Sequence, residues 1–310
     1  MKIVFCGTPE FAVPTLKAVV DAGHDVRLVV TQPDRGVGRG LVLQAPPVKV
    51  AAEALGIPFV QPEKIKNNLG FRAQLEDIRP DVILVVAYGR IVPDWMLALP
   101  PFGNINLHGS LLPKYRGAAP IQWAVARGET HTGVTTMLLE AGLDTGPMLL
   151  AQVVPIGVEE TSEDVFEGLA SVGAELMVKT LKGLEDGSVR PVAQNHALAT
   201  LAPILRREDG LVDFSRTAKE IYDRWRGFQP WPGAYSSLRG KKLILSKLRV
   251  CDGMDGDVGT VVVKGGGMMV ISGQRTGIEL VEVQMEGKKR MTAAEFLRGY
   301  QVKTGERVGA

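Results

Sequence analysis

KIVFCGTPEFAVPTLKAVVDAGHDVRLVV, residues 2–30, has the pattern of a strand, a helix and a second strand. KIVFC and DVRLVV are short, mostly apolar and rich in β-branched residues, which is typical of buried strands. The segment between them carries Pro14 near its start and Gly23 after its end, the usual punctuation of a helix. These residues therefore predict a βαβ unit, in which two parallel strands are joined by a helix.

The same alternation continues through the first half of the chain. Further strands are expected at 58–60, 81–87, 104–108 and 133–138. Helical patterns lie at 46–56, 71–78 and 119–129, and a longer one covers 162–187. This order predicts an α/β domain at residues 1–188, built on a doubly wound, mainly parallel sheet. In such sheets ligands bind at the carboxyl ends of the strands.

The second half of the chain has a different pattern. Residues 189–205 show mixed polarity, proline and no clean period, so we interpret them as a linker. One helical segment at 217–228 is followed by short β-rich runs that glycine-containing turns separate. Residues 206–310 are therefore expected to form a small, OB-like antiparallel β-barrel.

The composition excludes several classes of protein. Of 310 residues, 45% are hydrophobic and 23% are charged, which indicates a globular chain. No apolar run approaches the ~20 residues that span a bilayer, so no membrane partner is expected. The two cysteines, Cys6 and Cys251, lie far apart and suggest neither a disulfide framework nor a metal site. We expect a cytoplasmic protein, and a monomer by default.

The charge is unevenly distributed along the chain. The net charge is only +2, yet from residue 200 onward there are 19 Lys and Arg against 13 Asp and Glu. Such an asymmetry indicates a polyanionic partner for the basic half, although an ordinary basic surface is an equally good interpretation.

A polar face at one expected strand end is the main sign of function. In NINLH, side chains alternate between faces, so Asn104, Asn106 and His108 share the face opposite two apolar residues. Asp144 lies in LEAGLDTGPML, on a glycine-flanked loop after the next strand. Taken singly, each residue also has a structural interpretation, namely a core histidine and a turn-forming aspartate.

Together, Asn106, His108 and Asp144 provide an amide donor, an imidazole and a carboxylate. No serine or cysteine nucleophile accompanies His108, since Ser110 follows too closely to be a triad member. The set suits direct acyl transfer to an incoming amine: the amide and a charged imidazole stabilise an oxyanion while the carboxylate assists proton removal.

Two other chemistries lack their motifs. GTPEFAVP is not the G-x-G-x-x-G of dinucleotide sites, and RGVGRG does not lead from a strand directly into a helix. NAD and ATP are therefore not expected. The four histidines are scattered without ligand spacing, so no metal is expected either.

Several longer motifs carry a resemblance to a known family. These are FCGTPEFAVPTL, TQPDRGVGRG, VVAYGRIVP, HGSLLPKYRGAAPIQ, AGLDTGPML, REDGLVDF and FQPWPGAY. With them the chain resembles the folate-dependent formyltransferases over essentially its full length. The resemblance implies a Rossmann-like catalytic sheet with Asn106, His108 and Asp144 as the catalytic residues. It also implies 10-formyltetrahydrofolate as a co-substrate, and no metal.

The resemblance is strongest to the members that formylate the methionine of initiator methionyl-tRNA for translation initiation, because smaller relatives lack the glycine-arginine loop and the second domain. It implies that the loop 34–47 reaches the tRNA acceptor end. The implied folate-binding residues are Ala87, Tyr88, Gly89, Ser110, Leu111, Leu112 and Pro113. The residues expected to contact tRNA are Arg35, Arg39, Lys114, Arg116, Lys241 and Lys242.

Three other functions are compatible with part of this sequence. A formyltransferase acting on a nucleotide-linked amino sugar, or a hydrolase of the same donor, could share the three catalytic residues. The arginine-containing loop and the basic second domain argue against both, because a small acceptor needs no polyanion-binding surface. A catalytically silent RNA-binding module is the third, and the intact Asn106, His108 and Asp144 set argues against it.

Overall fold

The structure is a computed structural model that describes residues 1–37 and 42–309. The chain divides into two compact units. The first comprises Met1–Pro120, His131–Pro155 and Phe166–Pro203, and the second comprises Ile121–Thr130, Ile156–Val165 and Ile204–Ala310. Most of the segment interpreted as a linker is thus part of the first unit.

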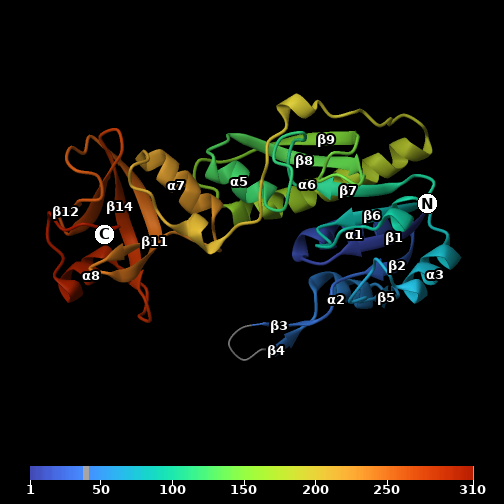
Figure 1. Ribbon diagram of the computed structural model, residues 1–310, viewed down its shortest axis with the longest axis horizontal. Coiled ribbons are helices and arrows are strands. Elements are labelled where there is room, and N and C mark those ends of the chain that lie inside the picture. Colours follow the sequence, from blue (N-terminus) through green and yellow to red (C-terminus); the bar gives the residue numbers. More distant parts are fainter. Residues whose placement is uncertain (38–41, 310) are drawn as a thin grey trace. The chain divides into compact units, whose positions relative to one another are not determined.

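The first unit contains a seven-stranded sheet (Figure 1). Its strands are β1 (Lys2–Gly7), β2 (Asp25–Val30), β5 (Phe59–Val60), β6 (Val82–Val86), β7 (Asn104–His108), β8 (His131–Leu138) and β9 (Met148–Pro155). Their order is β5-β2-β1-β6-β7-β8-β9, and the first five are mutually parallel. β8 runs antiparallel to β7, and β9 antiparallel to β8. The expected mainly parallel, doubly wound sheet is confirmed, with β9 as an additional edge strand.

Helices pack against this sheet, and side chains on the two faces of β7 contact two different helices. The helices are α1 (Val13–Asp21), α2 (Pro47–Ala54), α3 (Leu69–Ile78), α4 (Asp94–Leu97) and α6 (Ser162–Glu185), and β3 (Arg35–Val37) pairs antiparallel with β4 (Val42–Gln44). Leu107 packs tightly against Gly173 of α6, where an added Cβ would lie 2.7 Å from a Leu107 methyl carbon. On the other face, the Asn104 amide donates to the carbonyls of Met96 and Leu97 in α4, at 3.0 and 3.1 Å. The alternation expected in NINLH is therefore present.

The second unit holds a separate antiparallel sheet, as expected. Its elements are α5 (Pro120–Ala126), α7 (Ala218–Gly227), β10 (Tyr235–Leu238), β11 (Lys241–Asp252), β12 (Val261–Lys264), β13 (Gly267–Ser272), β14 (Thr276–Met285), β15 (Met291–Thr292) and α8 (Ala293–Tyr300). The order is β10-β11-β14-β13-β12, with β15 added to β14. A buried cluster of aliphatic side chains together with Phe214 and Phe296 fills its interior.

The last residues of the chain join the two edges of this sheet. At the β12 edge, the Val261 amide donates to the Glu306 carbonyl at 2.7 Å, and the Val308 amide donates to the Gly259 carbonyl at 2.9 Å. At the β10 edge, the Gly309 amide donates to the Ser237 carbonyl, also at 2.9 Å. Because both edges are paired with the same segment, the sheet closes on itself in the manner expected of a barrel.

Among the residues that the structure describes, no helix is long and apolar enough to cross a membrane.

We predict that Val308→Ala lowers the free energy of unfolding by about 1–3 kcal/mol, because Val308 is 4% exposed within the closing segment. The matched control is Val158→Ala in the same unit, where the valine is 85% exposed and the expected change is within ~0.5 kcal/mol. Urea unfolding of both variants measures the difference. Equal effects would contradict a structural role for the C-terminal segment.

Candidate functional site

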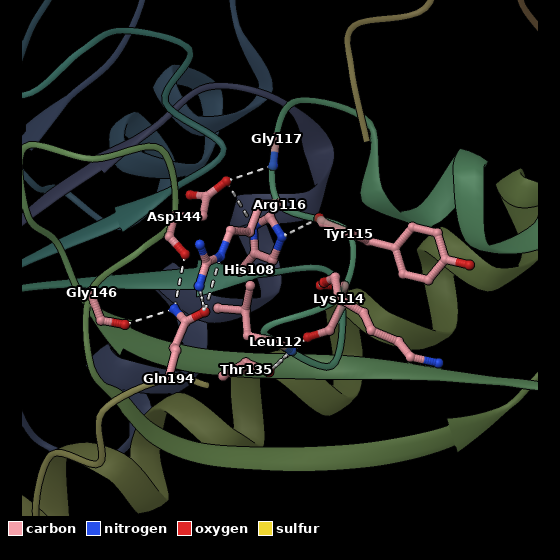
Figure 2. A network of polar contacts seen from close by, with 11 residues as sticks. His108, Leu112, Lys114, Tyr115, Arg116, Gly117, Thr135, Asp144, Gly146 and Gln194 are labelled. Carbon is pink, nitrogen blue, oxygen red and sulfur yellow. Dashed lines mark hydrogen bonds and ion pairs between the residues drawn. The ribbon is translucent and has the colours of Figure 1, made fainter. Parts of the chain in front are cut away.

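His108 lies at the carboxyl end of β7 and is held from both sides (Figure 2). Its side chain is buried, with 5% of the residue exposed. Nε2 lies 2.9 Å from the carbonyl oxygen of Tyr115, and Nδ1 lies 3.8 Å from Oδ2 of Asp144. Since a carbonyl oxygen can only accept, Nε2 carries the hydrogen and Nδ1 faces the carboxylate. The structure thus brings His108 and Asp144 together.

Asp144 is held by the loop that follows His108. Its Oδ2 accepts a hydrogen bond from the Gly117 amide at 2.8 Å. The backbone at Asp144 is left-handed, with φ of 49°, a conformation that costs a non-glycine residue free energy. Gly117 has φ of 122°, and a Cβ there would lie 2.6 Å from the Ala202 carbonyl oxygen. Glycine is therefore required at the point where the carboxylate is bound.

The two amides of β7 have different surroundings. Asn104 is 2% exposed and its amide is committed to the backbone of α4. Asn106 is half-buried, and within the described residues no hydrogen bond engages its side chain. Asn106 is therefore the amide that can donate to a ligand oxygen without breaking an existing contact.

The loop expected to line the folate site, residues 110–113, is hydrogen-bonded to Thr135 of β8. Thr135 Oγ1 donates to the Ser110 carbonyl at 2.7 Å and accepts from the Leu112 amide at 3.2 Å. The Ser110 hydroxyl donates to the Lys114 carbonyl at 2.7 Å, so it is already used within the loop. Leu111 and Pro113 are half-buried, and Leu112 is buried.

A cavity of about 420 Å³ opens at the carboxyl ends of β1, β2 and β6. Its walls include Ala87, Tyr88 and Gly89, which are expected to bind folate, and Arg35, which is expected to contact tRNA. Ala87 has a left-handed backbone, with φ of 47°. The Tyr88 carbonyl accepts from Thr8 Oγ1 and from Gln32 Nε2, each at 3.1 Å. The location is the one at which ligands bind in parallel sheets, although the cavity walls do not include His108 or Asp144.

Gln194 is a residue of the site that sequence reasoning missed. It is 5% exposed, and its Nε2 donates to the carbonyls of Asp144 and Gly146 at 2.9 and 2.7 Å. Its Oε1 accepts from Arg116 Nη2 at 2.6 Å and from Nε at 3.1 Å. No spacing signal could have identified it, because these partners lie 48 to 78 residues away in the sequence.

The residues expected to contact tRNA have diverse surroundings. Arg116 is 6% exposed and bound to Gln194, which differs from the exposed setting expected of a phosphate contact. Lys114 is exposed on the same loop. Arg39 lies outside the described residues. In the second unit Lys241 is exposed, whereas Lys242 Nζ lies 3.8 Å from the Tyr235 ring centroid, and burial and the neighbouring Arg207 charge lower the pKa of Lys242.

Within the part of the chain that the structure covers, no group of three or more His, Cys, Asp or Glu residues is placed to hold a metal ion.

Two family models match the chain in the two regions described above. The formyl transferase model matches residues 1–181, and the model of the formyl transferase C-terminal domain matches residues 204–301. The chain belongs to the formyl transferase family. A methionyl-tRNA formyltransferase of Acidobacterium capsulatum is 61% identical over 311 residues, with both chains fully covered. A methionyl-tRNA formyltransferase of Koribacter versatilis is 57% identical over all of this chain and 99% of its own.

Solved structures share the fold at low sequence identity. An N-formyltransferase of Helicobacter canadensis, in complex with folinic acid and dTDP-3-aminofucose, has a TM-score of 0.66 at 19% identity, with 92% of this chain and 99% of that chain covered. HypX of Aquifex aeolicus, in complex with tetrahydrofolic acid, has a TM-score of 0.64 at 16% identity, with 99% of this chain and 48% of that chain covered.

We predict that Gly117→Ala destabilises the protein by more than Gly23→Ala. Both glycines have positive φ, 122° and 83°, so each alanine adds strain of about 1–3 kcal/mol. Only at Gly117 does the added Cβ also meet a backbone oxygen, since no atom lies within 4 Å at Gly23. Thermal unfolding measures both variants, and an equal decrease in Tm would contradict the close approach of residues 117 and 202.

Proposed function

We propose that this chain transfers the formyl group of 10-formyltetrahydrofolate to the α-amino group of methionine on initiator methionyl-tRNA. The observation that carries the proposal is the grouping of an unengaged amide, a buried imidazole and a carboxylate at the end of β7. This grouping occurs in a chain 61% identical over its full length to a methionyl-tRNA formyltransferase.

In the proposed reaction the methionyl amine attacks the formyl carbon directly. The carbonyl oxygen becomes an oxyanion as the new C–N bond forms, and the amine becomes positively charged. Asp144, acting directly or through water, takes the proton from that nitrogen. The oxyanion then re-forms the carbonyl as the bond between the formyl carbon and N10 of the folate breaks, N10 takes up a proton in place of the one that Asp144 removed, and the products are formylmethionyl-tRNA and tetrahydrofolate. No covalent enzyme intermediate is required, in keeping with the absence of a nucleophile beside His108 among the described residues.

Asn106 and His108 stabilise the oxyanion in different ways. The Asn106 amide donates to the oxygen without giving up another hydrogen bond. His108 first has to release the Tyr115 carbonyl, because its Nε2 hydrogen is engaged there at 2.9 Å. Nδ1 of the ring still faces the Asp144 carboxylate, 3.8 Å away, while Nε2 turns to the substrate oxygen.

The proposed donor site extends from residues 110–113 to residues 87–89. Both segments follow neighbouring parallel strands, β7 and β6, so their ends lie at the same edge of the sheet. Ala87, Tyr88 and Gly89 line the cavity of about 420 Å³, and the other segment provides Ser110, Leu111, Leu112 and Pro113. The proposal needs no metal.

The proposed tRNA contacts come from two parts of the chain. Arg35, Arg39 and Lys114 would contact the acceptor end near the catalytic domain, proposed as residues 1–188. Lys241 and Lys242 would contact phosphates from the domain proposed as residues 206–310, with residues 189–205 between the two. Such contacts position the tRNA without reading its sequence.

We predict that Asn106→Ala lowers kcat by about 10²–10³, the usual loss for one oxyanion donor, while KM for each substrate changes little. The measurement is the initial rate of formyl transfer to methionyl-tRNA. Asn67→Ala, at an exposed asparagine between β5 and α3, is the matched control and should keep the unaltered rate. A normal kcat for Asn106→Ala would remove Asn106 from the mechanism.

A second prediction concerns the basic residues at the start of β11. The double variant Lys241→Ala, Lys242→Ala should weaken tRNA binding and reduce the slope of log K against log salt by about 1–2, one for each lost phosphate contact. Lys179→Ala, at an exposed lysine of α6, is the control. An unchanged slope would show that neither lysine contacts a phosphate.

A further inference from the structure

Gln194 uses every hydrogen-bonding group of its side-chain amide within the site. Its two N–H groups reach the carbonyls of Asp144 and Gly146, which lie on either side of Thr145. Its oxygen accepts both hydrogen bonds from Arg116. Figure 2 shows the Gln194 amide next to the loop that carries Asp144 and Gly146, with the guanidinium of Arg116, a residue of the loop that follows His108, beside the amide oxygen. A buried amide with all its partners present restricts the backbone that it contacts.

Residues 200–202, which follow Gln194 in the chain, are hydrogen-bonded to the loop that follows His108. The Arg116 amide donates to the Thr200 carbonyl at 2.9 Å, and the Ala202 amide donates to the Arg116 carbonyl at 2.7 Å. The Tyr115 amide donates to Thr200 Oγ1, also at 2.9 Å. Residues 194–202 therefore hold the backbone that provides the Tyr115 carbonyl to His108 and the Gly117 amide to Asp144.

The Asp144 loop needs such support for two reasons. Asp144 has a left-handed backbone, which is unfavourable unless the surroundings stabilise it. Its carboxylate also has to stay near the Gly117 amide and Nδ1 of His108, and a displacement of about 1 Å in a catalytic group can cost about 10² in rate. The carbonyls that Gln194 binds belong to Asp144 itself and to Gly146, so the amide acts on the position of this residue directly.

We propose that Gln194 is a positioning residue that, braced by Arg116, fixes the Asp144 loop and so holds the carboxylate at Gly117 and His108. Its catalytic consequence rests on the proposed formyl transfer, whereas its effect on the loop is independent of that function. Arg116 thereby acquires a role in the arrangement of the site, which accounts for its burial.

The first test follows the loop without any substrate. Hydrogen exchange of the Gly117 amide, measured by NMR, reports whether the Asp144 carboxylate still accepts from it. Gln194→Leu removes the donors and the acceptor at similar size, and Gln194→Glu keeps an acceptor for Arg116 while it removes the donors. Both should raise the exchange rate of this amide at least about tenfold. Gln152→Leu, an exposed glutamine of β9 that donates to the Val153 carbonyl, is the matched control and should leave it unchanged.

The second test uses kinetics to separate positioning from general destabilisation. Gln194→Glu should lower kcat about tenfold to hundredfold, with KM for donor and tRNA changed by less than about threefold. Introduced into Asp144→Asn, the same change should lower kcat by less than about twofold, because its effect passes through the carboxylate. A merely structural residue would lower kcat by the same factor in both backgrounds.

The outcomes distinguish this proposal from the proposed function. Unchanged Gly117 exchange in both Gln194 variants overturns the positioning role, and so does equal loss of kcat with and without Asp144. If the unaltered enzyme transfers no formyl group to methionyl-tRNA, the proposed function fails, and the exchange experiment still decides whether Gln194 holds the loop. If Gln194→Leu does not fold, Gln194→Glu provides the same comparison, since it retains the partner of Arg116.

Discussion

The hydrogen bond from the Gly117 amide to the Asp144 carboxylate, 2.8 Å long, is the contact on which the candidate site depends. It joins the loop after β7 to the loop after β8. Strand pairing alone does not bring these two loops together. Once they are joined, the Tyr115 carbonyl lies at one nitrogen of His108 and the carboxylate at the other. The ring is thereby fixed at the end of its strand, beside an amide that remains available to a ligand.

Several residues of the candidate site have unfavourable backbone conformations. Asp144, Tyr115 and Ala87 all have positive φ, at 49°, 60° and 47°. Such conformations persist where the surrounding structure determines them, and they concentrate at functional sites. Here the surroundings include residues 194–202, whose hydrogen bonds hold both loops. The segment that connects the family's two matched regions is therefore also part of the architecture of the site.

Much of the fold could be predicted because it follows local patterns. The apolar strands β1 and β6 and the second half of β2 are buried on both faces, so their sequences are continuous hydrophobic runs. β9 was missed because it lies at an edge of the sheet, with exposed residues such as Gln152 and Val153 in its middle. α8 was missed although TAAE at 292–295 carries the capping box that begins it, with Thr292 and Glu295 as its partners.

The site was predictable only where it follows the period of a strand. Alternation in NINLH places Asn106 and His108 on one face, and the structure retains that placement. Alternation could not separate Asn104 from Asn106. The difference between them is that Asn104 is bound to α4, and the alternation within a strand does not show which side chain a neighbouring helix will contact. Gln194 was beyond prediction for a similar reason: its partners are backbone carbonyls and an arginine that only the folded chain brings together.

Formyl transfer from radiolabelled 10-formyltetrahydrofolate decides whether this chain acts on initiator methionyl-tRNA. The acceptors offered in parallel are initiator methionyl-tRNA, elongator methionyl-tRNA, a dTDP-linked amino sugar and water alone. We expect label in initiator methionyl-tRNA, with little in the elongator and none in the sugar. Label in the sugar, or free formate released without an acceptor, would contradict the proposed function.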